Sequence, residues 1–152
     1  MELQARREFE TIVSAHVVEA GLVVHPTQSW LCGSPDGLFM MQDSPCLLEI
    51  KCPFSRKDSV IFDPDKEISF VPYIKYVNKR WALLKSHRYY TQVQLLMYIC
   101  NINLCFFYVY STVQSIVIVI ERDDSFLSSS VSALEDFYFT HLLPVLAKRR
   151  NV

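Results

Sequence analysis

Only three glycines occur in the 152 residues, and they do not form a glycine-rich loop. Loops that cradle phosphate groups, and the sharp turn that presents a catalytic serine, both depend on closely spaced glycines. Their absence argues against a small-molecule enzyme built on such an α/β fold.

Cysteine pairs with metal-binding spacing are also absent. The five cysteines make an odd number, no Cys-x-x-Cys occurs, and most of them lie in apolar runs, where a free thiol behaves as a small hydrophobe. Structural zinc and a disulfide framework are therefore not expected. This cysteine usage favours a reducing intracellular compartment and leaves nucleus and cytoplasm open. No signal peptide is visible, and the longest apolar run, residues 105–120, is too short and too interrupted to span a membrane.

Acidic residues are missing from residues 69–120, although the whole chain has a formal net charge of -1. The charged side chains of this segment are therefore all basic, and it also holds one histidine. These residues are Lys75, Lys79, Arg80, Lys85, His87 and Arg88. The acidic residues lie elsewhere in the chain. A basic face beside an acidic centre suits a nucleic-acid partner, and the alternative is an ordinary solvated surface.

Length and composition predict one globular domain over residues 1–152. Apolar residues at three-and-four spacing predict helices at about 3–20, 78–85, 87–102 and 125–148, the last with a capping box at Ser132-x-x-Glu135 and a kink or an end at Pro144. β-branched and aromatic runs predict strands at 21–25, 30–42, 46–52, 104–110 and 115–121, and residues 54–78 are interpreted as an insertion or long loop, with a small hairpin as the alternative. This order favours an α/β (α+β) fold with a mixed central sheet of about five strands flanked by helices.

Glu49-Ile50-Lys51 lies in one of these predicted strands. Because side chains alternate along a strand, Glu49 and Lys51 share one face, roughly 7 Å apart, while Ile50 points to the core. Glu-x-Lys on a strand is usually a solvated ion pair. Here Leu47, Leu48 and Ile50 flank the charged residues, and a buried carboxylate and ammonium are costly unless they are paired or metal-bound. The pair is therefore a candidate functional site.

Asp36 lies in Ser34-Pro35-Asp36-Gly37, a pattern that by itself is typical of a turn. A hairpin between the two neighbouring strands would place Asp36 beside Glu49. Two carboxylates and the Ile50 backbone carbonyl are oxygen ligands of the kind that magnesium takes, and magnesium needs only one or two carboxylates because it keeps several waters. Together with Lys51, such a centre has the groups that phosphodiester hydrolysis requires.

Four motifs follow one another along the chain: Gly21-Leu22-Val23-Val24-His25-Pro26, the segment from Trp30 to Gly37, Leu48-Glu49-Ile50-Lys51-Cys52-Pro53 and Tyr89-Tyr90-Thr91-Gln92-Val93-Gln94. With the closing segment from Phe137 to Pro144, they resemble the YqaJ-type viral recombinase family, to which phage lambda exonuclease belongs, within the PD-(D/E)XK nuclease superfamily. The resemblance covers nearly the whole chain and implies a restriction-endonuclease-like fold.

The resemblance also implies a role for each matching residue. Asp36 and Glu49 would be metal-binding carboxylates, with the Ile50 carbonyl as a further ligand of Mg²⁺ or Mn²⁺. Lys51 would orient or activate the attacking water, and Gln92 would face the site from a helix. The candidate DNA contacts beside this site are Ser34, Arg56, Lys85, Arg88 and Tyr89.

The sequence departs from the family pattern at two places. The family's first-helix acid falls on Glu2, with Glu8 and Glu19 as weaker candidates, yet an acid at this position also serves the helix dipole. The family has more chain before this glutamate, which indicates a truncated or reduced member. The stretch between Lys51 and Gln92 is longer than in the phage enzyme, and it is open whether residues 54–78 gate a substrate, bind a partner or are neutral.

The function implied by the resemblance is a Mg²⁺- or Mn²⁺-dependent deoxyribonuclease, more specifically an exonuclease, in DNA recombination or repair. It would hydrolyse phosphodiester bonds by in-line attack of water, and family members can form homo-oligomeric rings around DNA. The alternative is a nuclease-fold module that binds DNA or a partner without cutting. The intact Asp36, Glu49, Lys51 and Gln92 favour the enzyme.

Overall fold

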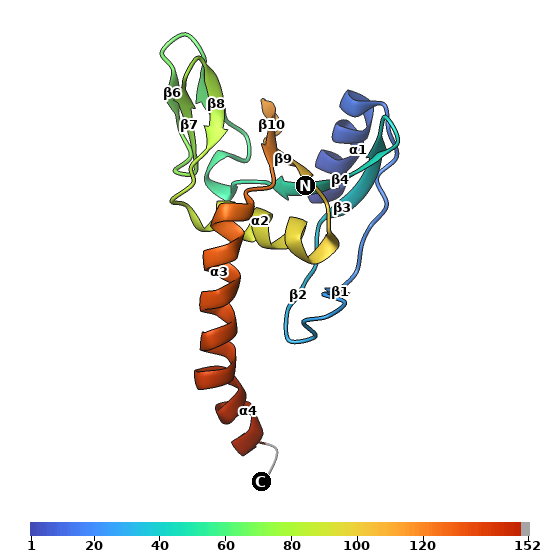
Figure 1. Ribbon diagram of the computed structural model, residues 1–152. Helices are drawn as coiled ribbons and strands as arrows, with labels where there is room; N and C mark the ends of the chain where they lie inside the picture. The colour runs from blue at the N-terminus through green and yellow to red at the C-terminus, as the bar shows by residue number, and fades with distance from the viewer. Residues whose placement is uncertain (150–152) are drawn as a thin grey trace.

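The computed structural model describes residues 1–149 and is built around a four-stranded mixed sheet with helices on both faces (Figure 1). Its strand order is β10-β9-β4-β3, with β3 at Gly37–Met41, β4 at Ser44–Lys51, β9 at Leu104–Tyr110 and β10 at Ser115–Glu121. β4 and β9 are parallel, and the two outer pairs are antiparallel. The predicted fold class is confirmed. The central sheet has four strands, because β1 (Val23–Val24) and β2 (Cys32–Gly33) form a separate pair.

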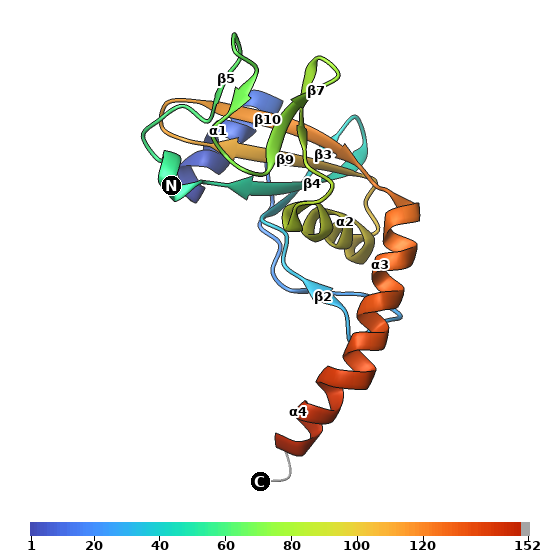
Figure 2. The ribbon, with the colours of Figure 1, turned by 90° about the vertical axis from the view of Figure 1, so that its left-hand side faces the viewer.

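Each face of the sheet has its own hydrophobic core. On one face α1 (Glu2–Val13) packs Phe9 against the Ile50 side of β4. On the other face α2 (Arg88–Cys100) packs Val93 into the core that contains Leu47 (Figure 2). Because side chains alternate along β4, Glu49 lies on the same face as Leu47 and therefore points toward α2.

The first helix ends at Val13, well before the predicted residue 20. Ser14 takes a left-handed conformation with φ 53°. The chain then runs along the edge of β3, where Val18 forms an antiparallel bridge with Leu38. A Cβ on Gly37 would lie 2.2 Å from Val17 Cγ1. Glycine is therefore favoured at this position by the close approach of Val17. Its backbone conformation is not the reason, because its φ is not positive.

Residues 54–78, for which the sequence predicts an insertion or long loop with a small hairpin as the alternative, contribute to two short hairpins. After η1 (Phe54–Arg56), β5 (Phe62–Asp63) pairs with β6 (Ile68–Ser69), and β7 (Ile74–Val77) pairs with β8 (Arg80–Leu83). The predicted helix at 78–85 is wrong, because Asn78 and Lys79 both have positive φ and form a tight hairpin turn. Tyr73 and Leu83 at the base of this hairpin belong to the α2-side core.

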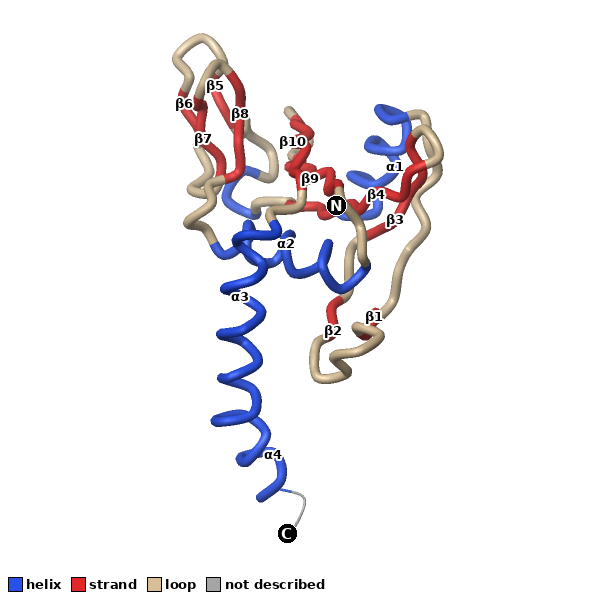
Figure 3. The backbone as a smooth tube through the Cα atoms, in the orientation of Figure 1, coloured by secondary structure: helices blue, strands red, loops and turns tan. Residues whose placement is uncertain are grey.

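The closing helix projects away from the sheet as a rod of three segments (Figure 3). These are α3 (Asp124–Phe137), the π turn η2 (Tyr138–Leu142) and α4 (Leu143–Arg149). The N-cap is Asp123, so the predicted capping box at Ser132 lies inside α3 and is wrong. Pro144 does not end the rod. The π turn directly before it locally widens the hydrogen-bond ladder that a proline would otherwise disrupt.

Within residues 1–149, no helix is both long and apolar enough to cross a membrane. All five cysteines are free thiols, and Cys46 and Cys105 are buried in the sheet. Burial raises the pKa of the Cys105 thiol well above its usual value, so this residue behaves as an apolar core side chain.

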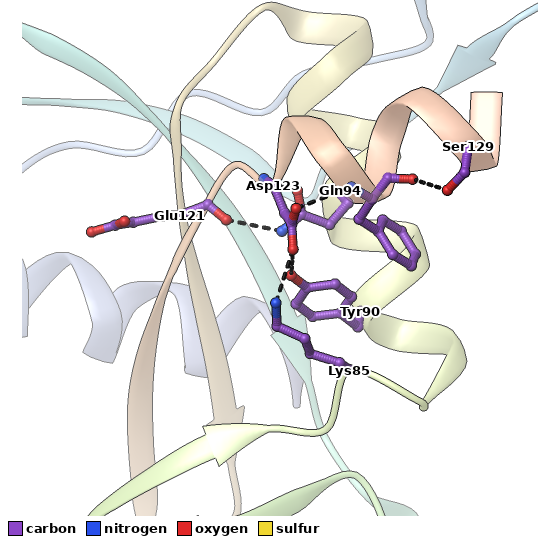
Figure 4. Close-up of polar contacts among 7 residues, drawn as sticks. Lys85, Tyr90, Gln94, Glu121, Asp123 and Ser129 are labelled. Atoms are coloured by element: carbon purple, nitrogen blue, oxygen red, sulfur yellow. Dashed lines mark hydrogen bonds and ion pairs between the residues drawn. The ribbon is translucent and has the colours of Figure 1, made fainter. Parts of the chain in front are cut away.

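The junction between β10 and α3 is held by a buried glutamine of α2 (Figure 4). The side-chain amide of Gln94 donates to the Glu121 carbonyl at 2.9 Å and accepts the Asp123 N–H at 2.8 Å. The Asp123 carboxylate in turn accepts from Tyr90 Oη at 3.0 Å and from Lys85 Nζ at 2.9 Å. Gln94 is fully buried, so water cannot replace its bonds.

We predict that Gln94→Met lowers the free energy of unfolding by about 2–4 kcal/mol, because it removes the partners of the Glu121 carbonyl and the Asp123 N–H. Urea denaturation measures this difference. Gln4→Met is the matched control, since Gln4 is exposed and bonds only to Glu8, and it should change stability by less than about 0.5 kcal/mol. Equal effects of the two substitutions would contradict the role given to Gln94.

Candidate functional site

Three elements converge at the Asp36–Glu49 centre. The β3–β4 register pairs Gly37 with Leu48 and so carries Asp36, just before β3, alongside Glu49. The Asp36 Oδ2 atom accepts the Ile50 N–H at 2.7 Å, which ties the carboxylate to β4. Gln92 reaches the same point from the first turns of α2. The hairpin that the sequence predicts here is confirmed.

The Glu49 carboxylate is held through one of its two oxygens. Oε1 accepts Lys51 Nζ at 2.5 Å and Gln92 Nε2 at 2.7 Å. Oε2 is buried and has no hydrogen-bond partner among residues 1–149. The whole side chain is only 1% exposed, so this second oxygen has lost its water without gaining a donor.

Burial raises the pKa of Glu49 to about 7, and the negative charges of Asp36 and Glu2 add to this effect. The Lys51 ammonium acts in the opposite direction and holds the pKa lower than burial alone would. A carboxyl group with such a pKa is unusual and is typical of functional sites. A cation at Oε2 would favour its ionised form.

Lys51 packs against a cluster of aromatic side chains. Its ammonium lies 4.7 Å from the centre of the Tyr89 ring, a cation–π contact, and the Arg88 guanidinium lies 5.5 Å from the same ring. Tyr73 packs its edge on Tyr89 with the ring centres 5.0 Å apart, and His87 lies 4.7 Å away. Of the candidate DNA contacts, Tyr89 therefore touches Lys51 directly, and Arg88 packs on the same Tyr89 ring.

The remaining candidates lie in other segments of the chain. Ser34 is exposed just before Asp36, and the Arg56 guanidinium lies over the Phe70 ring at 4.9 Å, in the segment that follows β4. Lys85 belongs to the β10–α3 junction, where it is paired with Asp123. Glu2 is exposed and pairs with Arg6 at 3.7 Å, and its negative charge contributes to the raised pKa of Glu49.

Two residues of this region were not predicted from the sequence. Tyr73 packs on Tyr89 from within the segment interpreted as an insertion, and Phe54 follows β4 with 91% of its surface exposed. Aromatic residues after Cys52-Pro53 and Pro72 are the only local indication, since whether such a ring is buried or exposed depends on the folded chain. Phe54 therefore presents an apolar ring to solvent only three residues after Lys51.

A divalent metal fits the donor atoms of this centre. Within residues 1–149, no three side chains of His, Cys, Asp or Glu lie close enough together to hold a metal, so a zinc-type site is not formed. Magnesium requires fewer protein ligands and prefers carboxylate oxygens. Glu49 Oε2, buried and without a donor, is such an oxygen, and Asp36 Oδ1 receives no hydrogen bond from the described residues.

A mixed sheet with an aspartate before one strand, Glu-x-Lys on the next and a helix glutamine over the same face defines the PD-(D/E)XK class of nuclease fold. Residues 1–103 match the model of the YqaJ-like viral recombinase domain. The chain belongs to this family.

Curated relatives come from two insect viruses. The chain is 32% identical over 114 residues to an alkaline nuclease of Orgyia pseudotsugata multicapsid polyhedrosis virus, covering 66% of this chain and 27% of that protein. It is 25% identical over 141 residues to an alkaline nuclease of Autographa californica nuclear polyhedrosis virus, covering 85% and 32%. The chain thus spans about a third or less of the length of these relatives.

Solved structures show the same fold. An alkaline exonuclease from Laribacter hongkongensis superposes with a TM-score of 0.71 at 25% identity, over 99% of this chain and 69% of that one. Its complex with dAMP gives the same TM-score at 24% identity, over the same shares of the two chains, and supports the fold alone.

The raised pKa of Glu49 predicts how stability depends on pH without metal. In the folded protein Glu49 keeps its proton up to about pH 7, whereas the unfolded chain releases it near pH 4.5, so stability falls as pH rises between these values. The loss is on the order of 3 kcal/mol at about 1.4 kcal/mol per pKa unit.

Thermal unfolding in EDTA at several pH values measures this dependence for the unmutated chain and for Glu49→Gln. The variant, which cannot ionise at this position, should lose less stability between pH 4.5 and pH 7. Parallel pH profiles for the two proteins would show that Glu49 is an ordinary carboxylate. The pKa of Asp123 is lowered to about 2 by its Lys85 partner, so titration of Asp123 changes stability only below pH 4.5.

Proposed function

We propose that this chain is a metal-dependent deoxyribonuclease, of the exonuclease type, that hydrolyses DNA phosphodiester bonds. The observation that carries the proposal is the Glu49 carboxylate, fixed at one oxygen by Lys51 and Gln92 and left without a donor at the other, buried oxygen. A purely structural carboxylate would have both oxygens satisfied, because an unpaired buried acceptor costs about 1–3 kcal/mol.

Asp36 and Glu49 are the residues that would hold Mg²⁺ or Mn²⁺, with the Ile50 carbonyl beside them. Such an ion, when bound, polarises a phosphate and makes a water more acidic. The two carboxylates would need to move little to bind the ion, because each is already held by a hydrogen bond. Asp36 is anchored by the Ile50 N–H, and Glu49 is anchored by the Gln92 amide.

Lys51 is the candidate for stabilising charge at the reacting phosphate. Its ammonium is only partly exposed, with 17% of its side-chain surface accessible, and the Tyr89 ring below restricts where it can move. A positive group in such a partly desolvated position interacts more strongly with developing negative charge than it would in water. It can also orient the attacking water by donating a hydrogen bond to it.

The family and its named relatives support the substrate class. The two viral relatives are alkaline nucleases, and the bacterial protein with the same fold is an alkaline exonuclease. We extend to this chain the nuclease activity of those proteins, with DNA as the substrate and recombination as the setting, as the family's name suggests.

A second function is favoured by one observation. Glu2, the candidate for a third acidic ligand, is exposed and paired with Arg6. If a third acid is essential for cleavage, the chain would bind DNA, or a partner, through the nuclease fold without cutting it.

We predict that the unmutated chain degrades end-labelled linear DNA only when Mg²⁺ or Mn²⁺ is present, and that Lys51→Ala lowers the rate by about a hundredfold or more, an effect of the size expected for loss of a charge-stabilising group. Lys66→Ala is the matched control, because Lys66 is an exposed lysine paired with Asp63 on a different hairpin. Its rate should equal that of the unmutated chain.

Each result decides between the two functions. Absence of metal-dependent cleavage by the unmutated chain would rule out the enzyme and leave the binding module. Cleavage that survives in Lys51→Ala would place the chemistry at another site or in a contaminating protein.

A further inference from the structure

The hairpin of residues 74–83, formed by β7 and β8, places its aromatic and its charged residues on opposite faces. Pairing of Tyr76 with Trp81 puts these rings on the inner face, where Trp81 also packs on Phe62 of β5 with ring centres 4.7 Å apart. Lys75 and Arg80 lie on the opposite, outer face because side chains alternate along each strand. Both are exposed, as is Lys79 at the turn.

The three basic residues of this hairpin have no ion-pair partner among residues 1–149. The neighbouring hairpin of β5 and β6 has the opposite character, since its turn carries Asp65 and Glu67, and its one lysine is paired with Asp63. The groove between β8 and β10 carries both signs of charge. Lys85 and Arg122 are paired there with Asp123 and Asp124, whereas Arg80 and Glu121, which also line it, have no ion pair among residues 1–149. Uncompensated positive charge is therefore concentrated on the outer face of the β7–β8 hairpin and at its turn.

Lys79 occupies a turn position that does not suit a lysine. Its φ is 62°, a left-handed conformation for which glycine is preferred at this place in a tight hairpin turn. The corresponding residue of the β3–β4 turn is Asp43, with the same φ, and aspartate tolerates this conformation much better. A turn that served only to reverse the chain would gain stability from glycine here. The lysine side chain is therefore best explained by something that it contacts outside the hairpin.

The base of the hairpin adjoins the candidate active site. Tyr73, directly before β7, packs on Tyr89, and Tyr89 supports Lys51. Figure 2 shows the hairpin rising from this base past the sheet, on the opposite side from the closing helix. β7 has four residues, so its turn lies about 13 Å from the base, which corresponds to about four steps along a DNA duplex.

We propose that the outer face and turn of this hairpin bind the phosphate backbone of duplex DNA several base pairs away from the bond that is cut. Lys75, Lys79 and Arg80 supply the contacts. The inference rests on the proposed nuclease function and adds a second DNA-binding surface to it. Its role is to hold the uncut duplex while the active site works at the end.

Binding of the full-length chain to a linear duplex of several helical turns tests this proposal, with fluorescence anisotropy recorded over a range of salt concentrations. EDTA is present, so that binding is measured without cleavage. Each phosphate contact contributes about 0.9 to the slope of log K against log salt. Lys79→Gly should lower that slope by about 1, and Lys75→Ala combined with Arg80→Ala by about 2, with affinity reduced by about tenfold in the double variant.

Lys79→Gly also separates a binding role from a structural one, because glycine suits the turn. Its melting temperature should equal or exceed that of the unmutated chain while DNA binding weakens. Lys66→Ala on the neighbouring hairpin is the control and should leave the slope unchanged. An unchanged slope in the hairpin variants, or an equal loss in Lys66→Ala, would overturn the proposal, as would the absence of salt-dependent binding by the unmutated chain.

The two proposals fail separately. Metal-dependent cleavage with hairpin variants that bind normally would overturn only the second DNA-binding surface. Weakened binding in those variants without any cleavage by the unmutated chain would support the surface and overturn the nuclease.

Discussion

The arrangement of this domain depends on keeping one ionisable carboxylate, that of Glu49, inside the α2-side core. Its Oε1 atom is satisfied by Lys51 from the same strand and by Gln92 from α2. Gln92 could not reach it unless α2 packed across β4. The other oxygen has no donor among residues 1–149, and in the proposed function it is the one that would bind the metal ion.

Helix α2 connects this centre with the rest of the molecule. Gln92 points to the carboxylate, whereas Gln94, two residues later and on another side of the helix, fixes the start of α3. At the N-terminus of α2, His87 caps the helix by accepting the Tyr89 N–H. The Tyr89 ring packs on Tyr73 at the base of the β7–β8 hairpin. Helix α2 thus contacts the candidate active site, the start of the closing helix and Tyr73 at the base of the β7–β8 hairpin.

Much of this fold follows from local patterns in the sequence. The apolar run of β4, the β-branched and aromatic runs of β9 and β10 and the periodicity of α2 predict those elements, because most of their side chains are buried in the cores on the two faces of the sheet. The approach of Asp36 to Glu49 follows from a hairpin. The early end of α1 and the β7–β8 hairpin were not predicted, because Val18 pairs with the distant Leu38 and Lys79 takes a conformation foreign to its residue type. The free oxygen of Glu49 and the supporting Tyr73 depend on tertiary packing, which no local pattern reports.

The most direct measurement of the central claim is the position of a bound metal ion. A crystal of this chain soaked in Mn²⁺, with anomalous scattering recorded, should place the ion about 2.0–2.6 Å from Glu49 Oε2 and from an oxygen of Asp36, with Lys51 and Gln92 still bonded to Oε1. An ion bound elsewhere, or a Glu49 carboxylate that stays without a ligand at saturating Mn²⁺, would contradict the assignment of this centre as the metal site.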